Sequence, residues 1–379
     1  MTRVRPIKAL RRPLVTIHSH FCPGTFGRDG DSNLIKQSLL NLMRVSGAFD
    51  LMRLISSRRA LILTYHRFSA DGDDDDGKTP ARQFAKQLEY LAAHYDVVPL
   101  SRMVERITAH EPLPSRLAAV TIDDGYRDAY DVAYPLLRRY GVSASLFVVT
   151  EFANRRAWIW TDKARFLTRQ AAPQRLTMKI RERELSLELN GEMSRRDASE
   201  RINSIIKRLS DESKEEAIRR LSLALGVAIP QTPPEEFSSV TWEQAREMYA
   251  NGVEIGSHTL THPILTNVGD ERLRRELRDS KSQLEEVLGH QVDLFCYPNG
   301  DNDERVQSEV ARAGYRAAVT VVNGLNQRGD DPLSLRRVHT ERDFAHFLQS
   351  TSGFEQLKSR LRVISSSPTG YELRSGKIE

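Results

Sequence analysis

The sequence is poor in cysteine and has no long apolar run. Its 379 residues include only two cysteines, Cys22 and Cys296, and two cysteines so far apart do not form a disulfide framework. No apolar stretch approaches the roughly 20 residues that a membrane-spanning helix needs. Near the N-terminus, Arg11, Arg12 and His18 interrupt any stretch of signal-peptide length. We therefore expect a cytoplasmic protein, with an extracellular or envelope-associated location as the alternative.

The chain also lacks a large excess of charge of one sign. Its 56 basic and 51 acidic residues leave a net charge of +5, which is too balanced to indicate a nucleic-acid partner. The first twelve residues differ, because they contain five basic residues and no acid. This segment is either a frayed basic tail or a contact to an acidic membrane surface. Neither composition nor patterning indicates an oligomeric state.

Short apolar runs alternate with helical patterns over most of the chain. Strands are predicted at 61–65, 118–122, 144–149, 253–256, 294–297 and 317–322. This α/β alternation predicts a parallel sheet, and repeats of this length favour a (β/α) barrel over an open sheet. The chain then divides into an N-terminal basic and helical extension (1–57), the first part of the barrel (58–150), a mostly helical insertion (151–238), the second part of the barrel (239–345) and a C-terminal tail (346–379).

Two histidines four residues apart follow the strand predicted at 253–256. His258 and His262 reach one point if their segment makes one helical turn. Two histidines and one carboxylate, with a position open to water, form a catalytic rather than a structural zinc arrangement. A pair of histidines alone is more often a pair of core or surface residues than a metal site, so a carboxylate nearby decides between these interpretations.

The acidic pair Asp123-Asp124 ends the strand predicted at 118–122. Adjacent carboxylates repel each other unless something compensates, and neighbouring residues of a strand point to opposite sides. One of them is then free to ligate a metal while the other acts as a base. The alternative is a helix N-cap followed by a first-turn acid. His66 also follows a predicted strand, and a barrel gathers residues at strand ends on one rim.

These motifs together resemble those of the polysaccharide deacetylases, the carbohydrate-esterase family with the NodB homology domain. Residues 121–125 resemble the T-F-D-D-G motif, 257–263 are similar to H-[ST]-x-x-H-P, and 295–300 resemble F-A-Y-P-x-G. Residues 63–66 resemble the Tyr-His opening of the branch that includes poly-N-acetylglucosamine deacetylases. The resemblance covers about 58–150 and 239–345, and it implies a distorted, incomplete (β/α) barrel.

The resemblance also implies roles for individual residues. Asp124, His258 and His262 would ligate one divalent metal ion, zinc or alternatively cobalt or nickel. Asp123 would be the general base, and the backbone N–H of Asn299 would stabilise the oxyanion. The implied reaction is hydrolysis of the N-acetyl amide of an N-acetylglucosamine-containing glycan. The alternatives are an O-acetyl esterase acting on a polysaccharide or small glycoconjugate, and a catalytically silent glycan-binding protein.

The chain departs from the family pattern at several positions. Cys296 stands where many members carry an arginine that orients the catalytic aspartate, and Arg337 is the expected substitute. Two histidines compete for the role of general acid, and the Tyr-His opening favours His66 over His339. In the insertion, Trp158 and Trp160 either stack on sugar rings or pack in its core.

Overall fold

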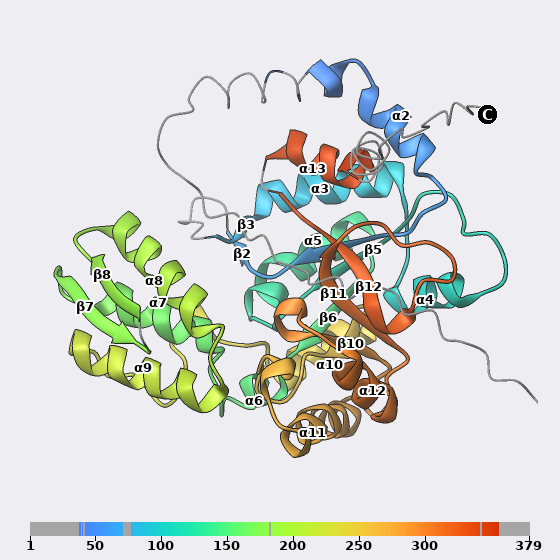
Figure 1. The fold of residues 1–379 in the computed structure, drawn as a ribbon. Coiled ribbons are helices and arrows are strands. Elements are labelled where there is room, and N and C mark those ends of the chain that lie inside the picture. Colours follow the sequence, from blue (N-terminus) through green and yellow to red (C-terminus); the bar gives the residue numbers. More distant parts are fainter. Residues whose placement is uncertain are drawn as a thin grey trace, which may run out of the picture.

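The computed structural model describes residues 38, 40, 42–70, 77–181, 183–341 and 343–355. Figure 1 shows a barrel, to which the insertion is attached as a separate body drawn in green. The basic N-terminal segment lies outside the described residues, so the predicted membrane contact stays a prediction. Within the described part of the chain, no helix combines the length and the apolar character that crossing a membrane requires.

Seven parallel strands form a closed barrel. They are β1 (Leu61–Tyr65), β5 (Leu117–Ile122), β6 (Ala144–Val148), β9 (Glu254–Ser257), β10 (Leu294–Cys296), β11 (Ala317–Asn323) and β12 (Leu335–His339). Their order is β1-β12-β11-β10-β9-β6-β5, and β5 pairs back to β1, which closes the ring; the short β4 (Asp96–Val97) adds to β5. A complete barrel of this type has eight strands, so the predicted incomplete (β/α) barrel is confirmed.

Helices and short elements surround the ring of strands. The helices are α2 (Ala48–Ile55), α3 (Ala81–His94), α4 (Leu100–Thr108), α5 (Tyr134–Tyr140), α6 (Thr150–Ala153), α10 (Trp242–Ala250), α11 (Asp270–Leu288), α12 (Glu304–Arg312) and α13 (Phe344–Thr351). Shorter elements are the strands β2 (Phe68–Ser69) and β3 (Thr79–Pro80), the π-helix η1 (Ala129–Ala133), and the 3-10 turns η2 (Glu235–Phe237), η3 (Leu265–Asn267), η4 (Pro298–Gly300) and η5 (Pro332–Ser334).

Alternate positions of the strands supply two different cores. Leu61 and Leu63 of β1 belong to the large core between the strands and the outer helices. Ile62, between them, belongs to a second core with Ala119 of β5, Val319 of β11 and residues of α4. Successive side chains of a strand point to opposite faces, so this second core fills the barrel interior, and α4 closes one end of it. Strands that are buried on both faces explain the continuous apolar runs of the sequence.

The insertion has a core of its own. It contains α7 (Trp160–Gln170), the antiparallel hairpin of β7 (Arg175–Ile180) and β8 (Arg183–Glu188), α8 (Glu192–Ile206) and α9 (Asp211–Leu225). Trp158 and Trp160 are both buried in this core, and Trp158 packs against Phe166 and Phe237. They are therefore packing residues and not sugar-stacking platforms.

Both ends of the described chain pack onto the barrel. Leu40 and Phe49 of the N-terminal extension join the large core, and so do Phe347 and Leu348 of α13. Figure 1 shows α2 and α13 on the same side of the barrel, next to α3. The boundary predicted at residue 345 falls inside α13 (Phe344–Thr351). The packed part of the chain therefore extends at least to residue 351.

Candidate active site and metal centre

Asp123 and Arg337 meet inside the barrel because of strand periodicity. Asp123 follows β5 and has the same parity as Ala119, which belongs to the interior core. Arg337 of β12 has the same parity as Leu335, which belongs to that core as well. Both β5 and β12 pair with β1, so the two side chains enter the barrel from strands on either side of β1.

Arg337 holds Asp123 with both ends of its guanidinium group. Nη1 and Nη2 each lie 2.7 Å from a different carboxylate oxygen of Asp123. Nε donates to the Thr320 carbonyl at 2.7 Å, and Nη1 also donates to Thr121 Oγ1 at 3.0 Å. Burial by itself raises the pKa of Asp123, but the charge and hydrogen bonds of Arg337 outweigh burial and lower this pKa to about 2. Asp123 is therefore a buried, ionised and oriented carboxylate.

Cys296, at the position where an arginine was expected, lies beside this pair. Its Sγ is 3.5 Å from Asp123 Oδ2, and Arg337 Nη2 donates to Sγ at 3.3 Å. The arginine that orients Asp123 therefore comes from β12 and not from the end of β10, where Cys296 lies. Burial, the largest influence, raises the pKa of the Cys296 thiol although Arg337 opposes it, so this residue is a neutral neighbour of the ion pair.

Replacing Arg337 by methionine should lower the free energy of unfolding by about 3–5 kcal/mol, because a buried carboxylate then has no partner. The pair stabilises the fold above the unfolded pKa of Asp123, about 3.9, and this contribution is lost as the pH falls toward about 2. Urea unfolding at neutral pH measures the effect. Arg336→Met is the matched control, because Arg336 is an exposed neighbour whose ion pair with Asp330 contributes at most about 1 kcal/mol.

Equal stability losses in the Arg337→Met and Arg336→Met variants would contradict this account of the pair. A second substitution, Asp123→Asn in the Arg337→Met background, should restore part of the stability, because it removes the unpaired charge.

The loop after β9 brings His258 and His262 to Asp124. Nε2 of His258 lies 3.3 Å from Asp124 Oδ1, and Nε2 of His262 lies 3.4 Å from the same oxygen. The segment does not make the helical turn that was considered for it, because Thr259 and His262 have φ values of 70° and 62°, in the left-handed region. The spacing of four residues still brings both rings together, through a strained loop instead of a helix.

Glu276 of α11 holds this loop, and the sequence alone did not single it out. Its Oε2 accepts the backbone N–H groups of Leu260 and Thr261 at 3.0 and 2.8 Å, and its Oε1 accepts Thr261 Oγ1–H at 2.6 Å. The Thr259 hydroxyl accepts the His262 N–H at 2.9 Å. The only signal in the sequence is an acid beside the apolar positions 273 and 277 of a charged helix, which is common in surface helices as well.

Asp124, His258 and His262 fit a catalytic zinc-type site. Their donor atoms are one carboxylate oxygen and two imidazole nitrogens, all buried and within 4.8 Å of one another. His258 Nδ1 lies 2.8 Å from the Cys296 carbonyl. A proton on Nδ1 leaves the lone pair of Nε2 directed at Asp124, as a metal ligand requires. Three ligands leave further coordination positions for water or substrate.

A second group of three side chains lies next to the first one. Asp123, His258 and Cys296 also have donor atoms within 4.8 Å of one another. Arg337 places a positive charge 2.7 Å from each oxygen of Asp123, and this charge would repel a cation bound there. Among the residues that the structure describes, no arginine or lysine forms an ion pair with the set of Asp124, His258 and His262, and so this set is the better metal site.

Two further histidines lie near the rim, and they differ in their contacts. His66 follows β1, is half exposed, and places Nε2 3.6 Å from Asp123 Oδ2. His339 ends β12, where its backbone is in register with Thr64. Desolvation of the His339 ring and the positive charges of His66 and Arg337 lower the pKa of His339. The structure therefore brings His66 to Asp123, whereas the surroundings of His339 disfavour its protonated form.

Asn299 occupies a tight turn after β10. It has φ 60° and lies in η4, between Pro298 and Gly300. Gly300 has φ 74°, and a Cβ there would come within 2.5 Å of the Val321 backbone nitrogen, so only glycine allows this turn to pack on β11. The turn begins beside His258, whose ring contacts the carbonyl of Cys296. The Asn299 side chain donates to Asp301.

Comparisons with known proteins agree with this site. The family model described as "Polysaccharide deacetylase" matches residues 110–318, which is more than half of the chain. YxkH of Bacillus subtilis (strain 168), a protein assigned to the polysaccharide deacetylases, is 20% identical over 278 residues, 73% of this chain and 70% of that protein. Chitin deacetylase 1 of Cryptococcus neoformans var. grubii is 33% identical over only 72 residues, 19% of this chain and 15% of that protein.

Two solved structures share the fold. The deacetylase PplD of Streptococcus pyogenes, in complex with acetate, superimposes with a TM-score of 0.53 at 18% identity, over 78% of this chain and 99% of that one. IcaB of Ammonifex degensii gives a TM-score of 0.52 at 20% identity, over 78% and 97% of the two chains. With the match of the family model, these findings lead to one conclusion: the chain belongs to the polysaccharide deacetylase family.

Proposed function

We propose that the protein is a metal-dependent deacetylase that hydrolyses the N-acetyl amide of an N-acetylglucosamine-containing glycan. One observation carries the proposal: the metal-type set of Asp124, His258 and His262 lies beside an ionised carboxylate, Asp123, that a buried arginine orients. The family relationship supports deacetylation as the reaction. The chitin deacetylase among the relatives supports an amide of an amino sugar as the bond that is cleaved.

Different residues of the site have different roles in the proposed hydrolysis. Asp124, His258 and His262 would hold one divalent ion, zinc with cobalt or nickel as alternatives, which supplies Lewis-acid activation of water and carbonyl when bound. Asp123 accepts the proton of the attacking water. Arg337 fixes the carboxylate in the orientation that this transfer needs.

Two further groups, the backbone N–H of Asn299 and the side chain of His66, are needed to complete the proposed reaction. The backbone N–H of Asn299 would donate to the oxygen that becomes negative in the tetrahedral intermediate. His66, half exposed at the barrel rim and 3.6 Å from Asp123, donates a proton to the departing amine. Without this proton the amine is a poor leaving group, so a proton donor is needed at this position.

Changing His66 to alanine should lower turnover by about 10²–10⁴-fold and remove the basic limb of the pH–rate profile, with metal content unchanged. His339→Ala is the matched control. Desolvation and the positive charges of His66 and Arg337 lower the pKa of His339, which disfavours its protonated form and makes it the weaker candidate for the acid. Acetate release and metal content are measured for both variants across the pH range. Loss of the basic limb in the His339→Ala variant alone would show that His339 is the general acid.

A substrate panel tests the function itself. Metal-loaded protein is incubated with N-acetylglucosamine oligomers, with an O-acetylated polysaccharide and with a small O-acetylated glycoconjugate, and released acetate is measured. We expect release from the N-acetylated oligomers. Release only from the esters would make the protein an O-acetyl esterase, and binding of a glycan without any release would make it a glycan-binding protein.

A further inference from the structure

The loop after β9, which carries the two metal-type histidines, lies between the barrel and the insertion. Leu265, three residues after His262, packs in the large core of the barrel. The preceding residue, Ile264, is 3% exposed and packs instead in the core of the insertion. Asn267 Nδ2 donates to the carbonyl of Leu209, which lies between α8 and α9, at 3.5 Å. The end of this loop is therefore fixed by both cores at once.

Hydrogen bonds hold the backbone of the same loop along both of its edges. On one edge, the Thr259 carbonyl accepts the N–H of Thr150 at 3.2 Å, where α6 begins. On the other edge, Leu260 and Thr261 donate their N–H groups to Glu276. The first contact is between backbone groups and the second involves a side chain, so the position of the Glu276 carboxylate determines how this second edge lies.

The carboxylate of Glu276 is buried and needs a charged partner. Glu276 is 1% exposed, and burial raises its pKa, although hydrogen bonds from Thr261 and the charge of Arg272 oppose this rise. Arg272, one turn earlier on α11, places Nε 3.7 Å from Oε1 of Glu276. The attraction between opposite charges is stronger at a buried position than in water. Arg272 therefore stabilises the charge of Glu276 and limits where its carboxylate can lie.

Arg272 is held in turn by the insertion. Its Nη2 lies 2.5 Å from Oδ2 of Asp211, the first residue of α9. The other oxygen of Asp211 accepts a hydrogen bond from Lys214 Nζ at 2.9 Å. Glu212 lies 3.8 Å from Arg272 but is 82% exposed, so it contributes little. Asp211, Arg272 and Glu276 thus form a line of alternating charges from the insertion to the loop of the metal-type histidines.

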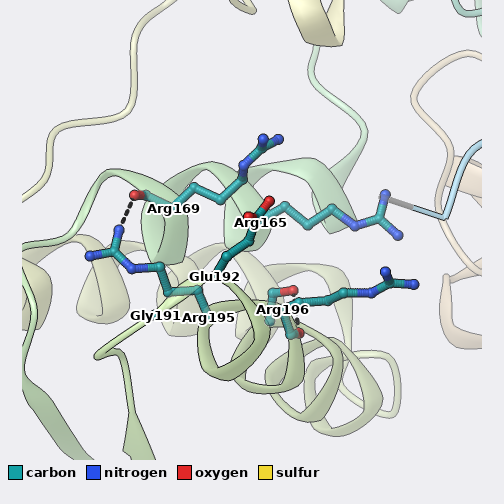
Figure 2. Close-up of a pocket in the computed structure, with 7 residues that line it drawn as sticks. Arg165, Arg169, Gly191, Glu192, Arg195 and Arg196 are labelled. Atoms are coloured by element: carbon teal, nitrogen blue, oxygen red, sulfur yellow. Dashed lines mark hydrogen bonds between the residues drawn. The ribbon is translucent and has the colours of Figure 1, made fainter. Parts of the chain in front are cut away.

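The packing of the insertion fixes the position of α9 and therefore of Asp211. Lys214 of α9 is 2% exposed, and its Nζ lies 5.1 Å from the centre of the Trp160 ring of α7. Figure 2 shows that α7 is joined to α8 as well, because the guanidinium group of Arg195 donates to the carbonyl of Arg169. The three helices of the insertion are thus linked to one another by side-chain contacts.

A second buried contact joins α7 to the barrel beside the metal-type site. The Tyr126 hydroxyl donates to Asp162 of α7, and both side chains are buried. Tyr126 lies two residues after the metal-type ligand Asp124. The insertion therefore contacts the barrel on two sides of the site, through Asp162 and through Asp211.

We propose that the insertion positions the metal ligands: Asp211 holds Arg272, Arg272 holds Glu276, and Glu276 holds the loop that carries both histidines. Asp211 and Arg272 are positioning residues, because they act through Glu276. This inference rests on the metal site of the proposed function, but it requires neither deacetylation nor any particular substrate. It makes the metal affinity of the barrel dependent on a charged residue of the insertion.

The metal affinity of the full-length protein tests this inference. Zinc is titrated in competition with a chromophoric chelator, and thermal unfolding of the metal-free proteins verifies that each variant is folded. Arg272→Met should lower the zinc affinity about 10-fold, since the loss of a partner outside the ligand shell typically costs about 10–100-fold. Arg278→Met is the matched control and should keep the wild-type affinity, because Arg278 lies on the same helix, its side chain is 73% exposed, and it pairs with its neighbour Asp279.

A double-mutant cycle tests whether Asp211 acts through Arg272. Asp211→Asn should lower the zinc affinity of the wild type, and it should have no further effect in the Arg272→Met background. The substitution also leaves the buried Lys214 without its partner, but this consequence is the same in both backgrounds and cancels in the cycle. Additive losses of affinity would show that Asp211 acts on the site by another route, and would overturn the proposed line of contacts.

Two further readouts distinguish positioning of the loop from packing of the helix. Arg272→Lys keeps a positive charge near Glu276 and should recover part of the zinc affinity that Arg272→Met loses. In the metal-free Arg272→Met protein, the N–H groups of Leu260 and Thr261 should exchange with solvent about 10-fold faster than in the wild type. Equal exchange rates at both positions, or an Arg272→Lys variant as weak as Arg272→Met, would contradict the positioning role.

Failure of this inference and failure of the proposed function give different results. Equal zinc affinities of the wild-type and Arg272→Met proteins would overturn the inference and leave the proposed function standing. Zinc binding that depends on Arg272, without acetate release from any acetylated substrate, would reject the proposed function and leave the inference standing. A wild-type protein that binds no zinc would overturn both.

Discussion

Replacing Asp123 by asparagine should lower the rate of deacetylation by about 10²–10⁴-fold and leave the metal content unchanged. Asparagine keeps the shape of the side chain and one acceptor oxygen for Arg337, but it cannot take a proton from water. Asp123 is 2% exposed, and its carboxylate is held by both ends of the Arg337 guanidinium group. Single-turnover acetate release, with metal content determined in parallel, measures the effect.

Asp131→Asn is the matched control, because Asp131 is half exposed in η1 and pairs with Arg127 on the surface. Its rate should equal that of the wild type. Turnover of the Asp123→Asn protein near the wild-type value, in a sample that unfolds like the wild type, would make Asp123 a structural partner of Arg337 and nothing more.

The low pKa of Asp123 also constrains the pH dependence. Arg337 outweighs the effect of burial and holds this pKa at about 2, so Asp123 is ionised at every pH above about 4. A loss of activity on acidification above that value must therefore come from other groups. Protonation of the imidazoles of His258 and His262 is the expected cause, because a protonated imidazole cannot ligate a metal.

Strand ends were the part of the site that sequence patterns could predict. Asp123, Asp124, His258 and His66 all follow short apolar runs, and parallel strands of a barrel end on one rim. The structure accordingly brings all four residues together. The pairing of Arg337 with Asp123 needed more than local pattern, because their strands are neighbours of β1 and meet only when the barrel closes.

Loop conformation was the part that the sequence could not give. The spacing of His258 and His262 would have suited one helical turn, whereas the loop has left-handed backbone at Thr259 and His262 and is held at Leu260 and Thr261 by Glu276, which comes from α11. A backbone conformation that depends on a contact from a distant helix cannot be predicted from the sequence of the loop itself.

Removal of a metal ligand should have the other large effect. His262→Ala and Asp124→Ala should each reduce bound metal from about one equivalent to a small fraction, and acetate release should fall with it. Chelation of the wild-type protein should abolish activity, and added zinc or cobalt should restore it. A metal ion that binds the folded protein but not the unfolded chain also stabilises the fold. The free energy of unfolding then rises by about 4.1 kcal/mol when the concentration of free ion is 1,000 times its Kd. This stabilisation should disappear in both variants, whereas His110→Ala, at an exposed position, should behave like the wild type.

The two adjacent ligand sets make different predictions for Cys296. His258 belongs to both sets, so its loss does not distinguish them, but His262 belongs only to one and Cys296 only to the other. If the ion lies on Asp124, His258 and His262, Cys296→Ser keeps a full equivalent of metal and His262→Ala does not. The reverse result would place the ion on Asp123, His258 and Cys296. Since Asp123 already bears two hydrogen bonds of 2.7 Å from the cationic Arg337, we expect the His262 variant to lose the metal.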